Sequence, residues 1–288
     1  MSVSWRQLWD TTATLTGRVE ARWLCEEACG QTGSDFIAVL DAAAGELSVA
    51  HLDAMVARHR AGEPLQYVLG HWSFRRLDLL VDRRVLIPRP ETELVAERAI
   101  ALVGHMAVDG GRWPLIVADL GTGTGAIGLS LATELPSGMV EVWLTDLSPD
   151  ALDVARANTA GVGNAGTCVR FGQGDWYQAL PTRLRGELAL VVSNPPYIAP
   201  DDQAIEAAVR DWEPAAALFA ADDGLAAIRV VIAGAAEWLT PGGWLVLEIG
   251  AGQGAAVLQL LNASAFEQTA VTQDLAGHDR IAAGCYVP

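Results

Sequence analysis

The chain has 288 residues, of which 51% are hydrophobic, so it can form one large domain, or two domains of unequal size, and is not disordered. Its formal net charge of -16 argues against a broad electrostatic grip on nucleic acid, which needs clustered Lys and Arg. No apolar run reaches the roughly 18 residues of a membrane span. The N-terminus resembles neither a signal nor a transit peptide, so we expect a cytoplasmic protein.

The cysteines and histidines predict no metal site. Cys25 and Cys29 lie four residues apart on a predicted helix, so they share one face. A metal pair is one interpretation, and buried thiols in a reducing compartment are the favoured one. The five histidines show no ligand spacing.

Residues 1–72 predict a helical N-terminal domain that recognises the substrate. Three amphipathic segments end at glycines, as helices commonly do: "VEARWLCEEACG" at Gly30, "SDFIAVLDAAAG" at Gly45 and "SVAHLDAMVARHRAG" at Gly62. We expect the second helix to start at Ser34 and the third at Ser48. Short helices joined by short turns suggest a small bundle.

Residues 73–90 predict a β-hairpin linker with its turn near Asp82-Arg83, because apolar and charged residues interleave there. The linker is rich in arginine, and these side chains are Arg75, Arg76, Arg83, Arg84 and Arg89. They suggest a basic patch that touches an acidic face of a partner, and a solvated hairpin face is the slightly favoured alternative.

Residues 91–288 alternate strands with helices. The strands are predicted in "LIVADL", "VEVWLTDL", "TCVRF", "LALVVSN", "GWLVLEIG" and a closing pair within "TAVTQDLAGHDRIAAGCYV". "SPDALDVARANTAG" is a helix with Ser148 as its cap and Pro149 at its first position. This order is typical of an α/β, Rossmann-like fold with a mostly parallel sheet, whose ligands bind at the carboxyl ends of the strands.

A glycine-rich turn follows the first of these strands and predicts a ligand site. In "DLGTGTGAIG" the glycines Gly121, Gly123 and Gly125, with Thr122 and Thr124 between them, allow a ligand to approach the backbone. The run also matches the dinucleotide fingerprint, a weak signal by itself. An ordinary tight turn between strand and helix is the alternative.

Two carboxylates change the interpretation of this turn. Asp119 precedes the glycines, where it would repel a pyrophosphate but could serve a positively charged ligand. Asp146 ends the second strand, where a carboxylate suits a ribose diol, although a charge at a helix N-terminus explains it nearly as well. S-adenosylmethionine carries a sulfonium and an ammonium group and no phosphate, so it fits better than NAD.

The segment "GDWYQAL" follows the third strand. In this sheet order Asp175 would lie near the adenine edge, and Trp176 would pack on the adenine face. Core filling by Trp176 is an equally good interpretation of the sequence, because the chain has ten tryptophans.

The run Asn194-Pro195-Pro196-Tyr197 ends a buried strand and predicts the catalytic site. Asn194 offers a side-chain oxygen and Pro195 a backbone carbonyl, so the two can bind both hydrogens of an NH2 group. The ring of Tyr197 can stack on a planar amide or base. An amide is a poor nucleophile, so positioning for attack on the methyl group is the main help available. A strand that simply ends in a proline-rich loop is the alternative.

These motifs resemble those of class I methyltransferases that modify planar NH2 groups. Further segments resemble the protein-(glutamine-N5) methyltransferases of peptide chain release factors: "GEPLQYVLGHWSF", "VLIPRPETELV", "DWEPAAALFAADDGL", "GGWLVLEIGAGQ" and "DLAGHDRIAAG". The resemblance implies that Gly121 to Gly125, Asp146, Trp176 and Asn194 contact S-adenosylmethionine, with S-adenosylhomocysteine as product. It also implies that Asn194 to Tyr197 hold a glutamine.

The activity that this implies is methylation of the glutamine N5 in the Gly-Gly-Gln loop of a bacterial release factor, a step connected with translation termination. A glutamine methyltransferase of a ribosomal protein would carry the same motif. An adenine-N6 nucleic-acid methyltransferase would also carry it, but the acidic charge counts against that. A module that only binds NAD would not need Asn194 to Tyr197. We expect no direct nucleic-acid contact and no membrane contact.

We also expect a monomer, although no motif decides the oligomeric state. Residues 201–214, which are acidic and loop-like, are predicted to border the substrate entrance and to become ordered when substrate binds.

Overall fold

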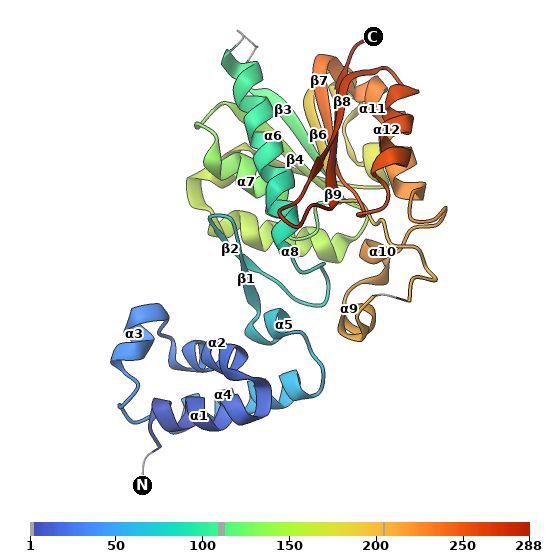
Figure 1. The fold of residues 1–288 in the computed structure, drawn as a ribbon. Helices are drawn as coiled ribbons and strands as arrows, with labels where there is room; N and C mark the ends of the chain where they lie inside the picture. The colour runs from blue at the N-terminus through green and yellow to red at the C-terminus, as the bar shows by residue number, and fades with distance from the viewer. Residues whose placement is uncertain (1–2, 109–112, 204) are drawn as a thin grey trace. The chain divides into compact units, whose positions relative to one another are not determined.

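The computed structural model describes residues 3–108, 113–203 and 205–288, and Figure 1 draws it as a ribbon. The chain divides into two compact units. One contains residues 1–71 together with 206–212, and the other contains residues 72–205 together with 213–288. Each unit has a hydrophobic cluster of its own, so each is described separately.

The helical unit packs its helices around Leu24, Phe36, Leu52 and Met55, which are almost completely buried. Its helices are α1 (Trp5–Thr16), α2 (Arg18–Cys29), α3 (Gly33–Ala38), α4 (Glu46–Arg60), α5 (Leu65–Leu69) and α9 (Ala207–Trp212). As predicted, α2 ends at Gly30, whose backbone is left-handed. Among the described residues no group of histidines, cysteines and acids could hold a metal ion.

The second predicted helix is shorter than expected. It begins one residue early, at Gly33, and ends at Ala38 instead of continuing to Gly45. Residues 40–44 leave the helix because they pair with the start of α1: the amide of Trp5 donates to the carbonyl of Ala42, and the amide of Arg6 to that of Leu40. The third helix, α4, begins at Glu46, two residues before the predicted Ser48. The spacing of apolar residues that predicts the helix carries no signal for these tertiary hydrogen bonds.

The segment predicted as a loop at 201–214 contains α9. This helix belongs to the helical unit, and the indole Nε1 of Trp212 lies 3.8 Å from where a Cβ on Gly62 would be. A side chain at residue 62 would therefore contact the indole. Position 204 of this segment lies outside the described residues.

The hairpin exists, but its turn is at Arg75-Arg76 and not at Asp82-Arg83. Its strands are β1 (His71–Phe74) and β2 (Leu77–Leu80). Arg75 takes a positive φ of 52°, and its amide donates to the Glu93 carboxylate over 3.0 Å. A partner from a distant helix thus holds a conformation that arginine rarely adopts, which explains why local turn signals missed it.

The larger unit is built on a seven-stranded, mostly parallel sheet, as predicted, and the strand order is β5-β4-β3-β6-β7-β9-β8. The first five strands in this order pair in parallel, and β9 pairs antiparallel with both β7 and β8. The strands are β3 (Leu115–Leu120), β4 (Val140–Asp146), β5 (Val169–Gln173), β6 (Leu188–Ser193), β7 (Leu239–Glu248), β8 (Phe266–Gln273) and β9 (Asp279–Tyr286).

Helices cover both faces of this sheet (Figure 1). One face carries α6 (Pro90–Val108), α7 (Ala126–Glu134) and α8 (Pro149–Gly161), and the other carries α11 (Ala226–Trp238) and α12 (Gly254–Asn262). The short helices are η1 (Gly163–Cys168), η2 (Trp176–Ala179), η3 (Thr182–Leu184) and α10 (Ala215–Leu218). Within the described ranges no helix is both long and apolar enough for a membrane crossing.

The local sequence explains the central elements. Every residue of β6 is buried, as expected for a strand covered on both faces. The hydroxyl of Ser148 accepts from the amide of Ala151 and caps α8 as predicted. After β3 the chain moves outward to β4 and β5 and then returns to β6 on the other side of β3. This reversal separates the loops that follow β3 and β6 and opens a crevice between them.

Candidate active site

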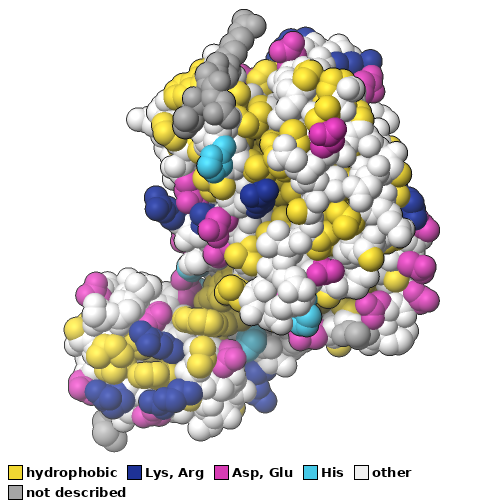
Figure 2. Space-filling view, turned by 45° about the horizontal axis from the view of Figure 1, so that its top comes forward, with side chains coloured by type: hydrophobic (Ala, Val, Ile, Leu, Met, Phe, Trp, Pro, Cys, Tyr) yellow, Lys and Arg dark blue, Asp and Glu magenta, His cyan; other side chains and the backbone are white. Residues whose placement is uncertain are grey.

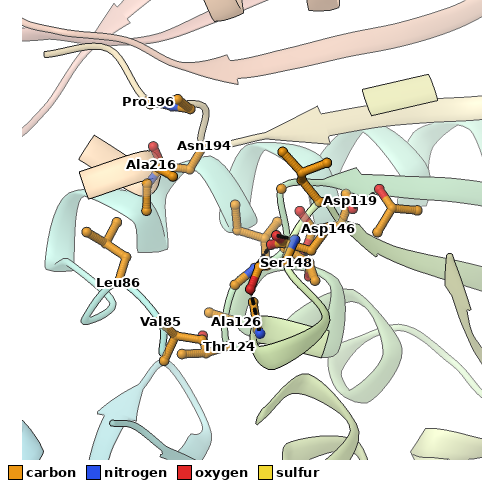
Figure 3. A pocket seen from close by; sticks show the side chains of 18 of the residues that line it. Val85, Leu86, Asp119, Thr124, Ala126, Asp146, Ser148, Asn194, Pro196 and Ala216 are labelled. Carbon is orange, nitrogen blue, oxygen red and sulfur yellow. Dashed lines mark hydrogen bonds between the residues drawn. The ribbon is translucent and has the colours of Figure 1, made fainter. Parts of the chain in front are cut away.

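A cavity of about 240 Å³ lies at this reversal, at the carboxyl ends of β3, β4 and β6. Most sequence-predicted site residues line it: Asp119, Gly121, Thr122, Gly123, Thr124, Asp146, Asp175, Trp176, Asn194 and Pro196. Gly125, Pro195 and Tyr197 are not part of the lining. Figure 3 shows Asp119, Asp146 and Ser148 on one side of the cavity, with Leu86, Asn194 and Ala216 across from them.

Asp119 braces the glycine turn. Its Oδ2 accepts the Thr122 hydroxyl over 2.7 Å and the amide of Gly128 over 3.0 Å. Gly125 has a φ of 87°, so the turn enters α7 through a left-handed residue. Burial raises the pKa of Asp119 to about 6, although both hydrogen bonds oppose this. The carboxylate therefore shapes the turn as well as lining the cavity.

Asp146 holds the other side of the same turn. Its Oδ2 accepts the amide of Gly123 over 3.0 Å, and its Oδ1 accepts the amide of Ser148 over 2.9 Å. Burial raises the pKa of this carboxyl group too. Each carboxylate oxygen can accept more than one hydrogen bond, so Asp146 can still receive a ligand hydroxyl.

Trp176 lies against the glycine turn. Its Cζ3 is 3.6 Å from the position that a Cβ on Gly121 would take. The backbone of Trp176 has a positive φ of 46°, and its ring is only partly buried against the core. The ring both packs on the core and lines the cavity, so the two interpretations of this tryptophan are compatible. Its neighbour Asp175 is exposed at the cavity edge.

The Asn194 side chain is held by a partner that sequence reasoning missed. Its Nδ2 donates to Thr92 Oγ1 over 3.2 Å, and Thr92 Oγ1 donates to Glu248 Oε2 over 2.6 Å. The hydroxyl of Tyr197 donates to Glu248 Oε1 over 3.0 Å. Both ends of the Asn-Pro-Pro-Tyr run thus converge on one carboxylate at the end of β7. Glu248 and Thr92 lie within segments that carried the resemblance, but no local pattern assigned them a role.

The backbone of Tyr197 is also held in place. Its carbonyl accepts Nε2 of Gln253 over 3.0 Å, and Gln253 Oε1 accepts the amide of Gly250 over 2.9 Å. Gly224 packs so closely on the Tyr197 carbonyl that a Cβ would overlap it. Burial and the neighbouring Glu248 charge raise the pKa of the Tyr197 phenol, so the hydroxyl keeps its proton.

The apolar wall of the cavity comes from two segments that sequence analysis did not assign to the site. Leu86 and Pro88 come from the loop between β2 and α6, and Ala216 and Ala217 come from α10. Glu213, just before α10, connects the two segments, because its carboxylate accepts the amide of Ile87 over 3.1 Å and pairs with the Arg89 guanidinium.

The arginines of residues 75–89 do not form one free patch. Arg75 is bonded to the Glu134 carboxylate at 2.7 and 3.0 Å, Arg89 pairs with Glu213, and Arg84 pairs with Asp82. Arg76 is 78% exposed and 3.9 Å from Glu134. On the face of the larger unit that Figure 2 shows, basic side chains stand among apolar and acidic ones. Internal ion pairs therefore involve Arg75, Arg76, Arg84 and Arg89.

The fold is that of a class I, S-adenosylmethionine-dependent methyltransferase. Residues 100–221 match the family model described as Methyltransferase small domain, and residues 12–70 match the PrmC N-terminal domain. A SAM-dependent O-methyltransferase from Thermotoga maritima has the same fold, with a TM-score of 0.50 and 13% identity over 71% of this chain and 68% of that one.

Two relatives narrow the class to a family. A release factor glutamine methyltransferase from Xylella fastidiosa (strain 9a5c) is 42% identical over 80% of this chain and 79% of its own. One from Burkholderia pseudomallei is 41% identical over 92% of this chain and 91% of its own. The chain belongs to the family of release factor glutamine methyltransferases, which confirms the resemblance of its motifs.

Proposed function

We propose that this enzyme methylates N5 of a glutamine side chain in the Gly-Gly-Gln loop of a peptide chain release factor. The observation that carries the proposal is the position of Asn194. It lies in the cavity wall at the end of β6, across from the glycine turn that follows β3. Its Nδ2 is engaged by Thr92, so the side-chain oxygen remains for a substrate NH2 group.

The residues around the glycine turn fit S-adenosylmethionine. Gly121 and Gly123 line the cavity without side chains, so a ligand can approach the backbone there. We assign Asp119 to the positively charged part of the cofactor, Asp146 to the ribose, and Asp175 with Trp176 to the adenine. When bound, the cofactor supplies an electrophilic methyl group on a sulfonium. Gly121 to Gly125 would contact it through the backbone.

The substrate amide would be held by Asn194 Oδ1 and the backbone carbonyl of Pro195. Two fixed acceptors bind both amide hydrogens and select NH2 over an oxygen. The Tyr197 ring, tied through its hydroxyl to Glu248, would stack on the amide plane. Pro196 and the apolar wall of the cavity would exclude water from this end when the substrate is bound.

We assign recognition of the release factor to the helical domain at residues 1–72, joined by the 73–90 linker to the methyltransferase domain at 91–288. This assignment is supported by the separate core of the helical unit and by the match of residues 12–70 to the PrmC N-terminal domain. We also propose that Arg83 and Arg84, the second of which pairs with Asp82, contact an acidic face of the release factor. Their reversal to Glu should raise the KM for release factor, and an unchanged KM removes that contact.

Mass spectrometry tests the activity. Purified release factor is incubated with the enzyme and S-adenosylmethionine, and Asn194→Ala serves as the control. We expect one added methyl group on the loop glutamine with the wild type and none with the control. Titration with S-adenosylhomocysteine and with NAD shows whether the cofactor site is intact and specific. If cofactor binds but no methyl group is added, ribosomal proteins and then adenine in nucleic acid become the acceptors to examine.

A further inference from the structure

We propose that Glu248 is a positioning residue that sets the direction of the Asn194 amide, acting through the hydroxyl of Thr92. This inference rests on the proposed function, because it explains how the site selects the NH2 of glutamine. Glu248 does not line the cavity, so its effect on the substrate is indirect.

The three side chains come from distant parts of the chain and meet in a buried network. Glu248 ends β7 and is 1% exposed, Thr92 lies in the first turn of α6 and is 4% exposed, and Asn194 follows β6. Glu248 Oε2 receives the Thr92 hydroxyl at 2.6 Å. Thr92 Oγ1 in turn receives Asn194 Nδ2 at 3.2 Å. In a buried environment without water each donor needs an acceptor, so this series of hydrogen bonds runs in one direction from donor to acceptor.

Counting protons fixes that direction. A threonine hydroxyl has one proton, and the ionised Glu248 can only accept, so Thr92 gives its proton to Glu248. The Thr92 oxygen then offers only lone pairs to Asn194. Of the two ends of the amide, only Nδ2 can bond to a lone pair. A reversed amide would place Oδ1 against an oxygen with no proton to share, so Oδ1 faces the cavity.

Burial raises the pKa of Glu248, but the geometry supports the charged form, because each of its two oxygens receives a hydroxyl donor. Its second oxygen receives the Tyr197 hydroxyl at 3.0 Å. Arg280 on β9 donates to the Ile249 carbonyl over 3.3 Å, and its positive charge acts on Glu248, while Glu91 on α6 opposes it. Burial raises the pKa of Glu248, and the hydrogen bonds from Thr92 and Tyr197 lower it. Both hydroxyl donors therefore stabilise the carboxylate that they orient.

The orientation of the Asn194 side-chain amide decides which substrate the cavity accepts. With Oδ1 exposed, the site presents acceptors and suits the NH2 of glutamine. With Nδ2 exposed, it would present a donor and suit the carboxylate of glutamate, which has no hydrogen to give. Glu248 thereby contributes to discrimination between glutamine and glutamate at one loop position.

The matched variants are Thr92→Ser, which keeps the hydroxyl, and Thr92→Val, which removes it with little change in volume. In Glu248→Gln the new amide can donate to Thr92, which frees the Thr92 proton for Asn194 Oδ1 and reverses the amide. Tyr197→Phe removes the other hydrogen bond to Glu248 and leaves the Thr92 branch intact.

The readouts are kcat/KM on release factor and the binding of two peptides that differ only in Gln or Glu at the loop position. We expect Thr92→Ser to stay within about threefold of wild type, and Thr92→Val and Glu248→Gln to lose roughly tenfold or more in kcat/KM. The Gln-to-Glu binding preference should fall in Thr92→Val and Glu248→Gln. It should be unchanged in Thr92→Ser and Tyr197→Phe, even where Tyr197→Phe slows the reaction.

A neutron structure of the wild type adds a readout that needs no substrate. Two deuterons on the Asn194 atom that faces Thr92 would support the proposal, and a reversed amide would overturn it. An unchanged peptide preference in folded Thr92→Val and Glu248→Gln, judged by thermal melting, would also overturn it. Failure of the wild type to methylate release factor would count against the proposed function, while the neutron result would still decide the direction of the amide.

Discussion

The backbone amide of Gly128 donates to Oδ2 of Asp119 over 3.0 Å, so the first turn of α7 is tied to the end of β3. The same oxygen accepts the Thr122 hydroxyl. One buried carboxylate therefore holds both the glycine turn, at Thr122, and the helix that follows it, at Gly128. Because this carboxylate also lines the cavity, its charge links the shape of the turn to the binding of a cationic ligand.

Asp119→Asn should weaken the binding of S-adenosylhomocysteine by about tenfold or more, because the amide carries no charge for the ligand ammonium group. Wild-type affinity should fall as the pH drops through about 6, the pKa that burial produces at Asp119. The affinity of the variant should not show this fall at low pH. Calorimetric titration from pH 5 to pH 8 measures both effects. Parallel pH profiles for the two proteins would contradict the assignment.

The Asp119 carboxyl group affects the stability of the fold with the opposite pH dependence: low pH weakens ligand binding but favours folding. Between its ordinary value of 3.8 and about 6, Asp119 stays protonated in the folded chain and ionises in the unfolded chain. Folding therefore binds a proton, and the free energy of unfolding should decrease as pH rises through this window, by up to about 3 kcal/mol. Thermal melts of the wild type and Asp119→Asn should diverge across the window. Melting curves that keep a constant separation would refute the shift.

Trp176→Ala should reduce the affinity for S-adenosylhomocysteine by about tenfold, because a base stacked on an aromatic ring gains roughly 1–3 kcal/mol. Trp176→Phe should retain part of this affinity. Trp113, which is 49% exposed and not part of the cavity lining, provides a control whose replacement by Ala should change nothing. Equal affinities for the wild type and Trp176→Ala would mean that this ring only fills the core.

Gly128→Ala should destabilise the protein by about 1–3 kcal/mol, because the added Cβ overlaps the fully buried Leu144 and crowds Asp119. Gly104→Ala in α6 is the matched control. Its Cβ meets nothing within 4 Å, so it should raise stability by about 0.5–1 kcal/mol through helix propensity. Denaturant unfolding measures both changes. A neutral Gly128→Ala would show that the core beside the turn can rearrange.

Arg75→Met should destabilise by about 2 kcal/mol, because it leaves the largely buried Glu134 without its bidentate partner. Arg76→Met should cost less than about 0.5 kcal/mol, since Arg76 is mostly exposed. The hydrogen bond from Arg75 lowers the pKa of Glu134, so the contribution is present above the ordinary value of 4.5 and is lost as pH falls through the lowered pKa. Equal unfolding midpoints for the two variants at neutral pH would contradict this.

The parts of the fold that rest on neighbouring residues were predictable. The bounds of β3 match "LIVADL", and α8 begins after Ser148, because strand burial and helix capping depend on adjacent positions. The hairpin turn lies away from the predicted position, because Arg75 is held in its positive φ by Glu93, which lies 18 positions away. The helix after Ser34 was predicted too long, because residues 40–44 pair with the start of α1.

The sequence by itself determined the fold class, the family and the Asn194-to-Tyr197 run, because alternating strands, glycine turns and a short rigid motif are read from adjacent residues. Only the tertiary structure decided which groups orient that motif. Thr92 and Glu248 lie 156 positions apart and meet because α6 packs over β7. A hydrogen bond depends on distance in space, and separation along the chain does not reveal it. The direction of the Asn194 amide follows from that meeting.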